Sequence, residues 1–158
     1  MAGPPVRQTG STVAGATAAS VVVTIPSGVV AGDVVIVSIY KENTNAVTPP
    51  AGYTEKPASG PSTTAPQAQH TFWHRASGSE SGTVTFSWTG SVFCAATADR
   101  ISGCVSTGDP VEGTPATNSS NASVATLNVS LAATSANTLL YWAGTDFTGG
   151  NAWTPPTG

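Results

Sequence analysis

The side chains best suited to chemistry in this sequence are its histidines and carboxylates, and their spacing defines no site. His70 and His74 share one face of a predicted strand, but at about 3.3 Å per residue they stand ~13 Å apart, too far to hold one metal ion. The carboxylates fall mostly in predicted turns, and they are Asp33, Glu42, Glu55, Glu80, Asp99, Asp109, Glu112 and Asp146. No spacing among them selects an acid and base pair such as glycosidases use. We therefore predict no catalytic residue, no cofactor and no metal ion.

Short motifs that carry known chemistry are missing as well. The sequence has no G-x-S-x-G nucleophile motif, no P-loop, no dinucleotide fingerprint and no calcium loop. Asp99 and Arg100 lie inside an apolar stretch, where we expect them to pair with each other or to cap an interface. Three N-x-S/T triplets, at Asn118, Asn121 and Asn128, resemble glycosylation acceptors. Glycosylation needs a secretory route, and the sequence shows no recognisable secretory signal. We predict that the protein is not an enzyme.

Composition excludes several classes of partner. Of the 158 residues, 8% are charged and 39% are hydrophobic, and the net charge is −3 with five Lys and Arg in all. This charge offers no basic patch for nucleic acid or an anionic membrane. The longest apolar run, "VVIVSIY" at residues 34 to 40, is far below the roughly 20 residues that cross a bilayer. Two cysteines, Cys94 and Cys104, are expected to be small buried hydrophobic residues rather than a disulfide.

Loop aromatics are the remaining candidates for a ligand site. Tyr53, Phe147 and Trp153 lie in or beside predicted loops, where exposed rings could stack on a sugar or anchor a partner. For Trp153 an internal repeat favours packing instead, because Val47 occupies the matching place. Tyr53 and Trp153 are thus candidate stacking residues for a glycan. Trp73, Trp88 and Trp142 fall in predicted strands and are expected to pack in a core.

The elements that would position these residues are short β-strands. In "TVTFSWT" at 83 to 89, apolar and hydroxyl residues alternate with the period of a half-buried strand. Similar stretches, separated by Gly, Pro, Ser or Asn, occupy residues 6–13, 20–26, 33–41, 53–58, 70–75, 92–101, 123–131 and 138–144. The total of about nine strands predicts an antiparallel sandwich or barrel. The length fits one domain. Either the polypeptide is complete with a loop-like C-terminal tail, or these 158 residues are part of a longer one; about nine strands already suffice to close a sandwich, which favours completeness.

One phrase occurs twice in the chain. "NAVTPPAG" at residues 45 to 52 returns as "NAWTPPTG" at 151 to 158, with six of eight positions identical. Both copies end a unit of strand, turn, apolar strand and polar loop, over residues 20–52 and 123–158. The paired prolines fix extended backbone that cannot donate to a ladder, so each copy should turn the chain at one end of the fold. Two such units suggest two sheets with approximate internal symmetry, as in a jelly roll or Greek-key sandwich.

Several of these phrases resemble a known group of proteins. "VTIPSGVVAGDVVIVSI", "TPPAGYT", "FWHRASGSESGTVTFSWTGS", "ADRISGCVSTGDPVEG", "ANTLLYWAG" and "WTPPTG" are similar to β-sandwich virion proteins of phages that infect actinobacteria and related bacteria. The resemblance covers nearly the whole chain, but it rests on turn and strand phrases rather than on functional residues. Relatives of this kind continue past the second TPP phrase with further strands, so a neighbouring subunit could supply a strand here.

The resemblance implies a structural role in a virus particle. Such proteins are capsid decoration (minor head) proteins or minor tail proteins, so we expect a virion protein, made in the bacterial cytoplasm, that binds the major capsid protein and forms a homo-oligomer, commonly a trimer. Residues 1–12 are predicted to form an N-terminal arm and residues 13–158 a single sandwich domain. In the arm, Pro4, Pro5, Val6 and Arg7 are the candidate partner-binding residues, because an extended segment could add to a neighbour's sheet edge. The alternative is a carbohydrate-binding module of a tail or adsorption apparatus.

Overall fold

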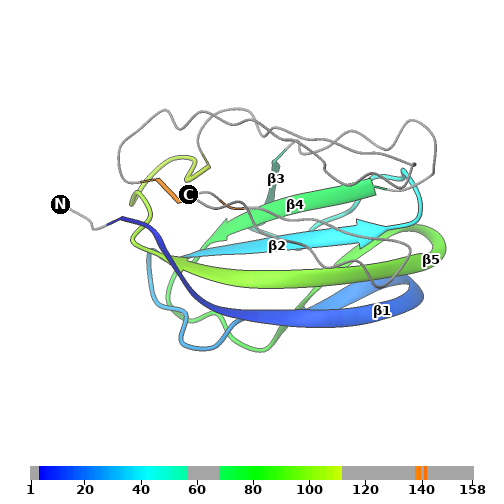
Figure 1. The fold of residues 1–158 in the computed structure, drawn as a ribbon, viewed down its shortest axis with the longest axis horizontal. Coiled ribbons are helices and arrows are strands. Elements are labelled where there is room, and N and C mark those ends of the chain that lie inside the picture. The colour runs from blue at the N-terminus through cyan, green and yellow to red at the C-terminus, as the bar shows by residue number, and fades with distance from the viewer. Residues whose placement is uncertain (1–3, 57–67, 112–137, 140, 142–158) are drawn as a thin grey trace, which may run out of the picture.

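A single antiparallel sheet forms the part of the chain that the structure describes. The structure is a computed structural model and describes residues 4–56, 68–111, 138, 139 and 141. Its five strands are β1 (Val6–Thr24), β2 (Val34–Lys41), β3 (Thr54–Lys56), β4 (Ala68–Arg75) and β5 (Thr83–Ser102). They lie in the order β1-β5-β2-β4-β3, and each neighbouring pair is antiparallel (Figure 1). The described residues contain no helix, which confirms the all-β prediction.

β2 is the central strand, and all eight of its residues are buried. Its sequence, VVIVSIYK, is rich in the β-branched residues that suit a pleated surface. Val35, Val37 and Ile39 point to one face of the sheet, whereas Val34 and Ile36 point to the other, and each set belongs to its own apolar cluster. Burial at every position therefore means that both faces of β2 are covered.

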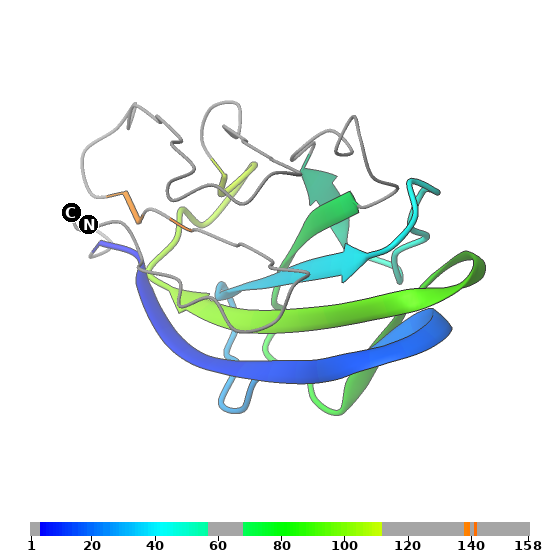
Figure 2. The same ribbon diagram turned by 45° about the vertical axis from the view of Figure 1, so that its right-hand side comes forward.

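β1 and β5 are long strands that curve together. They pair from Val6 with Ser102 to Thr24 with Thr83, and three register shifts interrupt the ladder. At the third shift Ala18 faces Val92 while Ser20 faces Ser87, so four residues of β5 bulge out against one of β1. Bulges of this kind bend a strand and increase its twist. The predicted strands 6–13 and 20–26 are consequently one curved strand, as are 83–89 and 92–101 (Figures 1 and 2).

The curve carries the end of β1 and the start of β5 back across one face of the sheet. Phe86 of β5 lies 5.0 Å from Phe72 of β4 between ring centroids, although these two segments are not neighbours in the sheet. Ser11 Oγ donates a 2.6 Å hydrogen bond to the carbonyl oxygen of Thr24, which joins the first part of β1 to its last residue. The main core fills the space between, with members from both parts: Val21, Val23, Val35, Val37, Ile39, Phe72, Phe86, Trp88, Ala96 and Ala98.

The first TPP phrase turns the chain as predicted. The backbone N–H and carbonyl of Thr48 both bond to Ser87, and the Tyr53 N–H then donates to the Pro50 carbonyl at 3.3 Å. Gly52 has a φ of +83°, which the third position of such a turn requires. The second TPP phrase, the predicted strand 123–131, Trp142, Phe147 and Trp153 lie outside the described residues.

Residues 6–12 form the first part of β1 rather than a separate arm. Val6 and Arg7 face Ser102 and Ile101 of β5. Both cysteines are free: Cys94 is buried in the core and Cys104 is half-buried against the second apolar cluster. Burial raises the pKa of both thiols, so each is held as a neutral thiol.

Candidate binding surfaces

Arg7 anchors the start of β1 to the sheet. Its Nε and Nη2 atoms lie 2.6 Å and 2.5 Å from Oδ1 of Asp99 on β5. Gly10 makes room for this pair, because a Cβ atom at Gly10 would lie 2.5 Å from both charged groups. The charge that we expected to reach a partner is therefore matched within the chain. Next to Arg7, Pro4 and Val6 are exposed and Pro5 is half-buried.

Asp99 also holds Tyr141 against the opposite face of the sheet from the main core. The Tyr141 hydroxyl donates to Asp99 Oδ2 at 3.0 Å and lies 3.3 Å from Ser38 Oγ. Burial, with the nearby Asp99 charge, raises the pKa of Tyr141 to about 12, so its hydroxyl remains a donor. The described part of the chain near residue 141 is thus fixed to β2 and β5 by one phenol.

The predicted pairing of Asp99 with Arg100 is wrong. Neighbouring residues of a strand point to opposite faces, so Arg100 reaches the main-core side while Asp99 faces Arg7. Arg100 Nε lies 2.6 Å from Oδ2 of Asp33, and both side chains are largely buried. Asp33 Oδ2 also accepts the Val30 N–H at 3.1 Å and so fixes the turn that precedes β2.

Exposed aliphatic side chains gather at the end of the sheet where β1 begins. Val6 is 47% exposed, Val105 56% and Leu139 39%. Val6 pairs with Ser102 at the end of β5, Val105 lies three residues after Ser102, and Leu139 is two residues from Tyr141. Figures 1 and 2 both place the start of β1, the loop after β5 and residues 138–139 at this end. We call Val6, Val105 and Leu139 the apolar end.

Tyr53 is built into the core rather than displayed. It is 9% exposed, its ring stacks on His74 at 4.9 Å, and its other neighbour is the edge of Phe86 at 5.2 Å. His74 Nδ1 lies 2.9 Å from the Gly52 carbonyl oxygen, an acceptor only, so that nitrogen carries a proton. These contacts occupy the ring of Tyr53, and stacking on a sugar would require the turn to move.

Glu80 forms the cap of the turn before β5 and a contact for His74. Its carboxylate accepts hydrogen bonds from the Ser77 N–H at 2.6 Å, the Ser77 hydroxyl at 2.8 Å and the Gly78 N–H at 2.8 Å. Burial acts to raise the pKa of Glu80, but these bonds from Ser77 and Gly78 outweigh it and lower the pKa well below the usual range. His74 Nε2 lies 3.3 Å from the same carboxylate. The turn and the histidine are therefore joined through one permanent anion.

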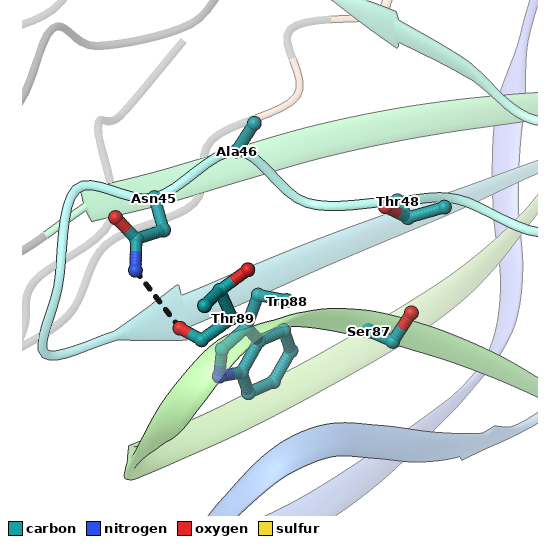
Figure 3. A pocket seen from close by; sticks show the side chains of 6 residues that line it. All are labelled: Asn45, Ala46, Thr48, Ser87, Trp88 and Thr89. Carbon is teal, nitrogen blue, oxygen red and sulfur yellow. Dashed lines mark hydrogen bonds between the residues drawn. The ribbon is translucent and has the colours of Figure 1, made fainter.

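A hollow of about 600 Å³ lies between the loop after β2 and the bulged part of β5 (Figure 3). Its lining carries hydroxyl and amide groups but no charge: Asn45, Ala46, Thr48, Ser87, Trp88 and Thr89. Asn45 Nδ2 donates to the Thr89 carbonyl at 2.8 Å. Trp88 is 7% exposed, and its buried Nε1 has no acceptor within the described part of the chain. Sequence reasoning missed this hollow, because it depends on a β5 bulge that brings distant segments together.

The histidines have separate structural contacts. His70 Nδ1 lies 2.6 Å from Glu55 of β3, whereas His74 contacts Gly52 and Glu80. Within the described residues, no three His, Cys, Asp or Glu side chains are grouped so that they could hold a metal ion. The same residues include no helix of the length and apolarity that a membrane crossing requires.

Comparison with known proteins gives no relative. The chain has no significant match to a protein-family model, to a curated protein or to a solved structure. Function must therefore be argued from the chemistry of the chain itself.

Proposed function

We propose that the chain is a non-enzymatic structural protein of a bacteriophage particle, a capsid decoration (minor head) protein that binds the outer surface of the shell and reinforces it. The phrases of the sequence that resemble phage β-sandwich proteins support this proposal. In it, the strands predicted beyond residue 111 complete a sandwich of jelly-roll or Greek-key type with about nine strands. The protein acts in the virion, with the major capsid protein as its partner, and it is assembled there as a homo-oligomer.

The observation that carries the proposal is that the cationic side chains all bond to groups of their own chain. The chain has five Lys and Arg residues, and each bonds to a group of the same chain. Arg7 pairs with Asp99, Lys56 with Asp109, and Arg100 with Asp33. The Lys41 amine donates to both oxygens of Asn43, and Arg75 donates to the backbone carbonyls of Gly32, Val105 and Gly108.

Except for the bonds of Lys41, which go to the nearby Asn43, these bonds join segments that are far apart in sequence. The cations are not gathered around a cleft. Lys41 is fully buried, and burial lowers the pKa of its amine, so this cation serves the interior. A chain whose few cations all form contacts within the chain has a rigid body, and it offers little positive charge to substrates or nucleic acid. Rigidity of this kind suits a particle-surface protein.

The apolar end, together with Pro4 and Pro5, is the proposed contact with the shell. Interfaces are driven by a desolvated apolar centre, and single charged substitutions there are costly. The test is co-sedimentation of the 158-residue chain with empty shells of the phage that encodes it. We expect binding, loss of binding on Val6→Glu or Val105→Glu, and normal binding by the control Thr85→Glu, an exposed position on the first part of β5. Failure of the unaltered chain to pellet with shells would refute the proposal.

A tail or adsorption-associated carbohydrate-binding module is the second candidate. The hollow beside β5 favours it, because hydroxyl, amide and indole groups without charge are the partners that neutral sugars use. A glycan array would test it with the intact chain and with Asn45→Ala and Trp153→Ala. Binding that both variants retain would argue against these residues, and an array without any bound glycan would remove this candidate.

A further inference from the structure

We propose that two copies of this chain pair through residues 20–24 of β1, about a two-fold axis at Val22. The pairing joins their two sheets into one continuous antiparallel sheet. β1 is the terminal strand of the sheet, and β5 is its only partner among the described strands. The proposal concerns a contact between identical chains. It therefore holds whether or not the protein binds a capsid, and the two ideas can fail separately.

The backbone groups of Val22 face away from β5, toward the edge that the described strands leave unpaired. In an antiparallel ladder, alternate residues direct both their N–H and their C=O toward one neighbour. The Ile25 N–H donates to the Gly82 carbonyl at 2.9 Å, so Ile25 faces the β5 side. On the far side of β5, Ser87 exchanges both its bonds with Thr48, which fixes the same alternation from the other strand. Val21 and Val23 therefore bond to β5, while Ser20, Val22 and Thr24 present their N–H and C=O groups outward.

The segment is complementary to itself. Its sequence is SVVVT, and a two-fold axis through Val22 places Val22 opposite its own copy, Val21 opposite Val23, and Ser20 opposite Thr24. Isologous interfaces require this reciprocity. Pairs of β-branched residues and of hydroxyl residues are favourable across antiparallel strands. With Val22 and its even neighbours facing outward, the central pair and the two flanking pairs can each exchange backbone hydrogen bonds.

The segment lacks the devices that keep an edge single. Natural edge strands are guarded by charges, prolines or bulges. No charged residue lies between Arg7 and Asp33, and no proline lies between Pro5 and Pro26. The register shifts of β1 end at Ser20, so residues 20–24 run unbroken. Val22 is 52% exposed and points away from the core, whereas Val21 and Val23 are buried.

A second copy fits this edge better than a foreign strand. The segment carries no charge, so two copies meet without repulsion, and the match of SVVVT to its own reverse is a property of the chain alone. Ser11 already donates to the Thr24 carbonyl at the end of the segment, but a carbonyl oxygen has two lone pairs and can accept a second bond.

The first test is the mass of the full chain in solution by sedimentation velocity across a wide concentration range. We expect a species of twice the 15.7 kDa chain mass that dissociates on dilution. Val22→Lys should raise the dissociation constant by roughly tenfold or more, because it places two like charges opposite each other. The control Val30→Lys changes a loop valine of similar exposure, 53%, and should leave the dimer intact. A monomer at every concentration, a trimer, or a dimer indifferent to Val22→Lys would overturn the proposal.

The second test fixes the register and does not depend on tolerance of a lysine. Hydrogen-bonded antiparallel partners have Cα atoms about 5.5 Å apart, a distance that a disulfide can span. In a Cys104→Ser background, Val22→Cys should form a covalent dimer on mild oxidation, and Val30→Cys should not. Cross-linking of both cysteines to the same extent, or of neither, would contradict pairing centred on Val22.

Discussion

Asp33 should be among the most sensitive charged positions of the chain. Its side chain is 5% exposed and its Oδ2 lies 2.6 Å from Nε of Arg100, which is 17% exposed. Asp33→Ala would leave the guanidinium largely buried without an anion. Removing one member of a buried ion pair costs about 3–5 kcal/mol of unfolding free energy. Partial exposure of Arg100 lets water compensate in part, so we expect about 3 kcal/mol.

The loss of the Val30 hydrogen bond adds little to this figure. Val30 is 53% exposed, so water can reach the turn and replace the carboxylate as acceptor. Arg100→Met should cost a similar amount, because it leaves the Asp33 carboxylate buried and unpaired. The double variant Asp33→Ala/Arg100→Met removes both charges, so it should cost about 3 kcal/mol rather than the sum of about 6 kcal/mol for the two single variants. The cycle should therefore give a coupling energy of about 3 kcal/mol.

Urea unfolding followed by tryptophan fluorescence would measure all four proteins, since the chain contains four Trp residues. Equal m-values would show that the unfolding reaction is the same in each variant. The unfolding free energy of a small domain is about 5–15 kcal/mol, so the expected loss is a large fraction of it. A cost below about 1 kcal/mol for Asp33→Ala, or additive single costs, would refute the view that this pair is a buried structural tie.

Three further outcomes follow from other contacts. The pKa of Glu80 is lowered on folding, so its carboxylate contributes stability that is present above the unfolded pKa of about 4.3 and lost as pH falls through the folded pKa. Glu80→Gln should thus cost roughly 1–2 kcal/mol near neutrality in denaturant melts, with the gap to the parent closing in acid. Gly10→Ala should lower stability by about 1 kcal/mol by pushing Arg7 from Asp99, and should be nearly neutral when Asp99 is already Ser. Burial raises the pKa of all three tyrosines, Tyr40, Tyr53 and Tyr141, to about 12. The native chain should therefore show little phenolate absorbance at pH 11, and its stability should fall as the pH rises above the unfolded pKa of about 10. Ordinary phenolate titration near pH 10 in the folded chain would contradict that burial.

Local pattern was enough to find the central strands. β2 and β4 lie within two residues of the predicted ranges 33–41 and 70–75, because continuous β-branched and aromatic residues between turn residues leave few other structures open. The turn at Gly52 follows from residue chemistry in the same way. These features depend on residues that are close in sequence.

Features that depend on distant residues were not predictable. Gly90 and Ser91 indicate a turn between two strands, yet the chain continues there through a bulge, since pairing with β1 sustains β5 on both sides. Arg7 and Asp99 are 92 positions apart, and Asp33 and Arg100 are 67 apart. Their pairing follows from strand order and from which face each residue occupies. Tyr53 lies in a turn, as expected, but its burial could not be predicted for the same reason, because it is set by His74 and Phe86.

The scarcity of charge connects the fold to the proposed association. A chain with five cations, all bonded internally, cannot rely on electrostatic steering to find partners, so contacts must come from apolar side chains and open backbone groups. The structure has both, at different places: the apolar end near the start of β1 and the uncharged edge around Val22. Two separate contact surfaces of this kind allow one chain to bind a neighbour through one and a second copy through the other. That arrangement is what a protein needs if it is to link subunits of a larger assembly rather than coat them singly.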